Sequence, residues 1–119
     1  MQCLLLLFSD EAGWSTLSVG ERQRWMGAYQ AYTEALIEAG VFKGANHLLS
    51  SAGAATVRVA RGKASVMDGP FAETKEHFGG YYVVDVDSLD RAIELAAEVP
   101  GARLGSIEVR PIMDFTQMS

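Results

Sequence analysis

The chain has 119 residues, of which 49% are hydrophobic and 21% charged, and its formal net charge is -5. This length and composition predict one folded globular domain over residues 1–119 and exclude a disordered chain. The basic residues are scattered, so we expect no direct nucleic-acid binding, and no apolar run is long enough to span a membrane. The single cysteine, Cys3, excludes an intrachain disulfide, and we expect a cytoplasmic protein.

The first two predicted elements are a buried strand and a long helix. Residues 2–8 form a continuous apolar run, which is typical of a strand covered on both faces. Ser18 and Glu21 have the spacing of a capping box, which predicts that a helix begins there and ends near Gly40. Apolar residues recur every three or four positions along this helix and form one face. They are Trp25, Tyr29, Tyr32, Leu36 and Ala39.

The middle of the chain predicts short strands. Residues 41–51 carry a weak pattern interrupted by glycine, which suggests a short or irregular strand. Residues 56–60 alternate between apolar and polar, and a turn containing Gly62 separates them from residues 64–67. The two segments therefore predict a β-hairpin.

The last third predicts a strand, a helix and a final strand. Residues 79–86 are rich in aromatic and β-branched side chains, as strands are. Asp87 or Ser88 is expected to cap a second helix, and residues 106–112 alternate well enough to form the last strand. The expected inward face of that helix comprises Leu89, Ala92, Ile93, Ala96 and Ala97.

The order of these elements predicts an α+β fold of the ferredoxin-like type, a split β-α-β arrangement with an inserted hairpin. Two helices would cover one face of the sheet, and the chain has no third long helix for the other face. An isologous contact between two copies would cover the same patch on both of them. We therefore expect a homodimer.

Residues 68–76, with the sequence DGPFAETKE, are the most informative segment of the chain, and residues 79–82 follow them with GGYY. Together they resemble the signature of the DGPF-domain branch of the YCII-like family. The apolar start and residues 108–112 extend the resemblance to nearly the whole chain. It implies a dimeric α/β barrel in small bacterial proteins, some of them found near or fused to extracytoplasmic-function sigma factors. It implies no settled activity.

Some YCII-like proteins are thought to use a His and Asp pair in a pocket, and the resemblance carries this role to Asp68. Two interpretations of Asp68 stay open: a general base in a pocket, with His47 as its proton-exchanging helper, or an acceptor for the amides of its own turn. The other histidine, His77, follows the signature directly, and we expect it to face solvent.

Four more residues are predicted to bind a ligand or form the pocket rim: Phe71, Glu73, Lys75 and Tyr82. Each also has a structural interpretation, as an anchor of the loop, a solvated charge or a packing residue. The two histidines are thirty residues apart, and the sequence contains neither a metal-ligand spacing nor a phosphate-binding glycine loop. We therefore expect no metal and no cofactor.

Two functions are compatible with these features. The first is a homodimer that binds a small organic molecule near Asp68, with cofactor-independent acid-base chemistry as its activity. The second is a non-enzymatic module that binds a protein partner, such as a sigma factor, through residues 73–76.

Overall fold

The computed structural model describes residues 1–72 and 74–117. Its strands and helices, in chain order, are β1 (Gln2–Ser9), α1 (Glu11–Ser15), α2 (Val19–Glu38), β2 (Phe42–His47), β3 (Ala55–Ala60), β4 (Lys63–Asp68), β5 (His77–Asp85), α3 (Leu89–Ala97) and β6 (Ser106–Pro111). Single 3-10 turns lie at Ser51–Gly53, Pro100–Arg103 and Phe115–Gln117. Within the described residues, none of the helices is both long enough and apolar enough to cross a membrane.

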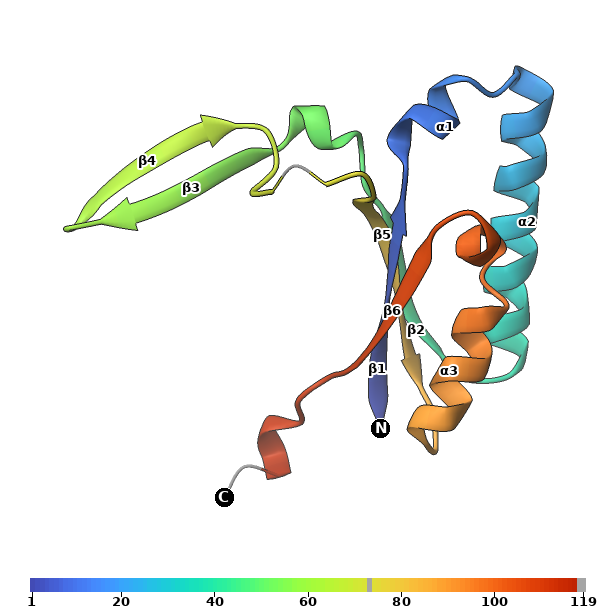
Figure 1. Ribbon diagram of the computed structural model, residues 1–119. Coiled ribbons are helices and arrows are strands. Elements are labelled where there is room, and N and C mark those ends of the chain that lie inside the picture. Colours follow the sequence, from blue (N-terminus) through green and yellow to red (C-terminus); the bar gives the residue numbers. More distant parts are fainter. Residues whose placement is uncertain (73, 118–119) are drawn as a thin grey trace.

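Four strands form one sheet in the order β2-β5-β1-β6, and each neighbouring pair is antiparallel. The helices α2 and α3 lie on one face of this sheet (Figure 1). This arrangement confirms the α+β prediction and is consistent with a ferredoxin-like fold into which β3 and β4 are inserted as a separate hairpin.

The start of α2 confirms the predicted capping box. The Ser18 hydroxyl accepts from the Glu21 amide at 3.1 Å, and the Glu21 carboxylate accepts from the Ser18 amide at 3.2 Å. The chain leaves this helix through Gly40, whose φ of +75° favours glycine. The short helix α1 was not predicted; Asp10 caps it by accepting from the Ala12 amide at 3.0 Å.

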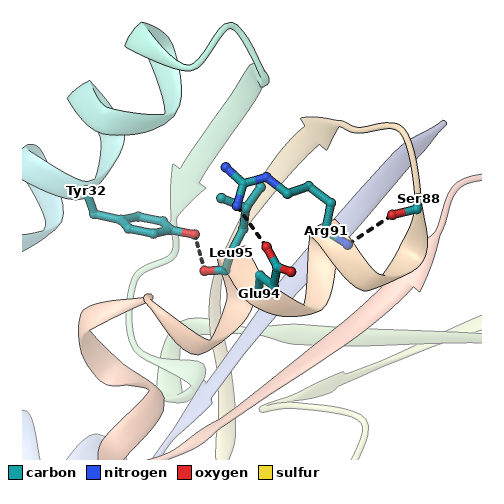
Figure 2. A network of polar contacts seen from close by, with 5 residues as sticks. All are labelled: Tyr32, Ser88, Arg91, Glu94 and Leu95. Carbon is teal, nitrogen blue, oxygen red and sulfur yellow. Dashed lines mark hydrogen bonds and ion pairs between the residues drawn. The ribbon is translucent and has the colours of Figure 1, made fainter.

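The core lies between the sheet and the two long helices. Alternate residues of β1, namely Cys3, Leu5 and Leu7, are buried against the helices. Tyr32 of α2 donates a hydrogen bond of 2.7 Å to the Leu95 carbonyl of α3 and so links the two helices (Figure 2). Burial raises the pKa of the Tyr32 hydroxyl, which therefore stays protonated as a donor.

The predicted inward face of α3 is partly wrong. Leu89, Ile93 and Ala97 are exposed, and Leu95 is buried in their place beside Ala92 and Ala96. The helix has only nine residues, so its rotation is set by what it packs against, which is mainly β6 and β1. The outer side of α3 carries the ion pair of Arg91 with Glu94, at 3.1 Å.

The other face of the sheet is not covered by any helix of the described chain (Figure 1). Leu6 lies opposite Tyr81 and Leu4 opposite Val83, and cross-strand partners share a face. Because Leu5 and Tyr82 point to the helices, this second set points away from them. We call these four residues, with Phe8 and Phe78, the open face.

The β3–β4 hairpin, residues 55–68, projects from the sheet on the side opposite to the helices (Figure 1). We call it the arm. Its strands are joined by Arg61 and Gly62, whose φ values of 53° and 75° are those of a tight type I′ hairpin turn. Apart from Thr56, every residue of its two strands is exposed.

Candidate functional site

A groove of about 610 Å³ lies where β1 ends and β5 begins. Its walls are the segment that follows β2 and the loop that follows β4. Apolar side chains dominate the lining: Phe8, Leu48, Leu49, Ala54, Pro70, Phe71, Ala72 and Phe78. The polar side chains of the lining are Ser50, Ser51, Thr74, Glu76 and His77. Phe8 and Phe78 pack with their ring centroids 5.6 Å apart, so two aromatic rings form one wall.

Glu11 fixes the polar wall of the groove. Its carboxylate accepts hydrogen bonds from the Ser51 amide at 2.8 Å, from the Ser51 hydroxyl at 2.9 Å and from the Ser50 hydroxyl at 3.2 Å. The Ser51 amide is the main cause that lowers the pKa of Glu11 below its ordinary value of 4.5. The ionised carboxylate therefore ties α1 to the segment after β2.

Replacing Glu11 by glutamine is expected to destabilise the fold by about 1–2 kcal/mol near pH 7, because a charge-assisted acceptor becomes a neutral one. The pKa of Glu11 is lower in the folded chain, so its contribution is full above pH 4.5 and is lost as the pH falls through the folded value. In urea unfolding, the difference in unfolding free energy between the variant and the wild type should be smaller at pH 3.5 than at pH 7. The control is Glu34→Gln on the exposed side of α2. A difference that is the same at both pH values would contradict the role of the ionised carboxylate.

His77 is half-buried and lines the groove, so the prediction that it faces solvent is wrong. It is the first residue of β5, which begins two residues earlier than predicted, and it pairs with Ser9 of β1. Its Nδ1 atom is shielded from solvent and has no hydrogen-bond partner within the described residues. The Glu11 carboxylate is close enough for His77 to contribute to the lowering of its pKa. A histidine with one nitrogen unpaired within the described residues thus lines the same groove as Ser51, which the Glu11 carboxylate holds.

Asp68 ends β4 at the base of the arm, and its side chain is exposed. The turn after it is closed by other groups: the Gly69 amide donates to the Ala54 carbonyl at 2.6 Å, and the Thr56 hydroxyl donates to the Gly69 carbonyl at 2.9 Å. Gly69 has a φ of +100°, which L side chains rarely adopt. The lining of the groove begins at Pro70, two residues after Asp68.

His47 ends β2 on the side of the sheet that faces the helices. Its ring meets the ring of Tyr29 on α2 edge to face, with the centroids 5.2 Å apart. It does not belong to the groove lining, and no hydrogen bond joins it to Asp68 in the part of the chain that the structure describes. The single chain therefore does not bring the predicted Asp68 and His47 pair into contact.

The predicted rim residues lie in different environments. Phe71 lines the groove and is 75% exposed, with the Arg58 guanidinium 5.1 Å from the centre of its ring. Tyr82 is only 2% exposed and lies in the core, where its hydroxyl shares a hydrogen bond of 2.9 Å with Thr33. Lys75 is exposed on the loop, between two lining residues. Glu73 lies outside the described residues.

Among residues 1–72 and 74–117, no three His, Cys, Asp or Glu side chains are grouped closely enough to hold a metal ion. The chemistry available at the groove is that of an imidazole, hydroxyl groups and carboxylates next to aromatic surface. Imidazole exchanges protons near neutral pH, and hydroxyls donate or accept hydrogen bonds. The groove can therefore hold the apolar part of a small molecule and make a hydrogen bond to a polar group of that molecule.

Comparison with known proteins gives two matches. Residues 1–116 match the family described as YCII-related domain. An uncharacterised protein of Rhizobium meliloti (strain 1021) is 40% identical over 110 residues, which cover 91% of this chain and 89% of that protein. Both matches run through the sheet, the arm and the groove.

Proposed function

The chain belongs to the YCII-related domain family, and from that premise we propose that it is a homodimeric protein that binds a small organic molecule in the groove beside residues 68–76. The observation that carries the proposal is the composition of the groove, in which aromatic walls meet one polar cluster. Ligand sites are commonly apolar clefts with a few converging polar groups. Residues 68–76 supply five of the lining residues, Pro70, Phe71, Ala72, Thr74 and Glu76.

Cofactor-independent acid-base chemistry is the activity that we propose for this site. Two histidines compete for the role of proton-exchanging group. His77 lines the groove and has an unpaired nitrogen, whereas His47 packs on Tyr29 away from it. We therefore assign the role to His77 first and keep His47 as the second arrangement. Asp68 stays the proposed general base next to the groove, because within the described residues its carboxylate is not used by its own turn.

Two phenylalanines of equal exposure allow a matched test of the groove. Phe71 is 75% exposed and lines it, and Phe115 is 77% exposed and does not. The probe is 8-anilinonaphthalene-1-sulfonate, titrated by its fluorescence. Phe71→Ala should weaken binding about tenfold, because losing a buried aromatic contact costs on the order of 1–1.5 kcal/mol. Phe115→Ala should change binding less than twofold. Equal effects of the two substitutions would refute the groove as the binding site.

Homodimerisation is proposed to occur through the open face. Leu4, Leu6, Tyr81 and Val83 form an apolar strip there, and Glu108 and Arg110 pair with each other beside it on β6. An apolar strip with a polar border is the usual composition of a subunit interface.

The alternative proposal is a regulatory module that binds a partner protein such as an extracytoplasmic-function sigma factor. The observation that favours it is the exposure of Thr74 and Lys75, two residues of the second half of the signature. Co-purification of a defined sigma factor with the chain, with probe binding in the groove unchanged, would favour this alternative over a ligand-binding role.

A further inference from the structure

The arm has one apolar side and one polar side. Val57 pairs with Val66, and Arg58 pairs with Ser65, so the two pairs lie on opposite sides of the hairpin. The apolar side comprises Val57, Val59 and Val66, which are between 59% and 68% exposed. A two-stranded hairpin is marginally stable in water unless its apolar side packs against something. Nothing in the described part of this chain covers that side.

The chain exposes more surface than a compact monomer of its size. Its accessible area is 8570 Å², whereas about 6,300 Å² is expected for 12.9 kDa. Its radius of gyration is 16.6 Å, against about 13.5 Å for a compact domain of this length. The excess of roughly 2,300 Å² for each chain amounts to about 4,600 Å² for two chains, which lies within the total area that obligate homodimers bury.

The shape of the chain indicates where the excess surface lies. The molecule measures 52 × 48 × 18 Å, which is flat and wide. The arm leaves the sheet on its open side, and the C-terminal residues 112–115 also extend toward that side (Figure 1). The open face is thus bordered by two projecting segments, and Met113 and Phe115 make the second of them apolar as well.

The charge of the arm differs from that of the rest of the chain. Residues 55–68 contain Arg58, Arg61 and Lys63 and one acid, Asp68, so their net charge is +2. The whole chain carries -5, which leaves -7 on the other residues. A basic arm is therefore attracted to the acidic body of another copy.

We propose that the arm of each chain docks by its valine side onto a second copy of this chain. The inference rests on the proposed homodimer and adds to it a second contact area, outside the open face. In a two-fold dimer each arm reaches the partner while the partner's arm reaches back, so both valine sides are covered at once. The arm is then a dimer clasp whose order depends on assembly.

Adjacent residues of β4 give a matched test. Val66 lies on the valine side and Ser65 on the polar side, and a glutamate at either position changes the charge of the arm equally. Sedimentation equilibrium should show that Val66→Glu raises the dimer dissociation constant at least tenfold, while Ser65→Glu raises it less than threefold. Equal values for both variants, or no change in either, would overturn docking by the valine side.

Amide hydrogen exchange of residues 56–67 gives a second readout that does not depend on a substitution. Above the dimer dissociation constant the amides that bond across the hairpin should be protected, and on dilution below it their exchange should become at least tenfold faster. Fast exchange in the intact dimer would overturn the clasp while leaving dimerisation by the open face in place. A wild-type chain that is monomeric at all concentrations would refute the homodimer and the clasp together.

Discussion

Replacing Leu5 by alanine is expected to lower the free energy of unfolding by about 3 kcal/mol, the middle of the range for buried leucines. Leu5 is fully buried and lies in the centre of the sheet, between Tyr82 of β5 and Val109 of β6. The loss combines the transfer of the removed methyl groups with the cavity that they leave. Urea unfolding at a fixed protein concentration measures it.

The control for this experiment is Leu49→Ala. Leu49 is 95% exposed, and its substitution removes the same atoms as Leu5→Ala. Its effect should stay within about 0.5 kcal/mol, as for surface substitutions in general. Similar effects of the two changes would mean that Leu5 does not occupy the centre of the core.

Replacing the next residue, Leu6, by arginine is expected to convert the proposed dimer to a monomer. Leu6 lies opposite Tyr81 on the open face, so the substitution would bury a guanidinium on each side of the two-fold contact. Burying an unpaired charge in an interface costs about 2–5 kcal/mol, which corresponds to at least a thirtyfold weaker dimer. Sedimentation velocity at micromolar concentration measures the change.

The matched control is Ile93→Arg, on the outer side of α3, where the side chain is 50% exposed and faces away from the sheet. This change should leave the sedimentation coefficient of the dimer as it is. A Leu6→Arg variant that still forms the wild-type dimer would show that the open face is not the contact.

The elements that sequence predicts well are those whose signals are local. The strand at residues 2–8, the Ser18 and Glu21 capping box and the Gly62 turn each need only a few neighbouring residues, and all three are confirmed. The predicted cover on both faces of that strand is not confirmed, because Leu4 and Leu6 on the open face are only partly buried. The face of α3 is different, because Leu89, Ile93 and Leu95 are equally apolar. Only the way in which α3 packs on β1 and β6 decides which of them is buried.

The polar cluster of the groove could not be predicted, because its members are distant in the sequence. Glu11 and Ser51 are 40 residues apart and belong to a short helix and a loop that carry no motif. His77 was expected to face solvent because β5 was predicted to start at Gly79. The strand in fact begins at His77, and the side chain of this residue lines the groove.

The placement of Asp68 and His47 depends on how the arm leaves the sheet, which no local pattern encodes. Two residues of the signature, Pro70 and Phe71, line the groove, and they follow Asp68 by two and three positions. Tyr82 was predicted at the rim, but strand alternation in β5 could not say which of Tyr81 and Tyr82 faces the helices. The register with β1 decides it, since Tyr82 pairs with the buried Leu5.

The arm also bears on the solubility of the protein. Among the residues that the structure describes, each of its strands pairs only with the other, so both outer edges present backbone amides and carbonyls that another strand could bond. Exposed edges next to a valine-rich surface are templates for open-ended aggregation, and charged residues on them oppose it. Arg58, Arg61 and Lys63 are those charges, and their removal would favour fibrous aggregates over a closed pair of chains.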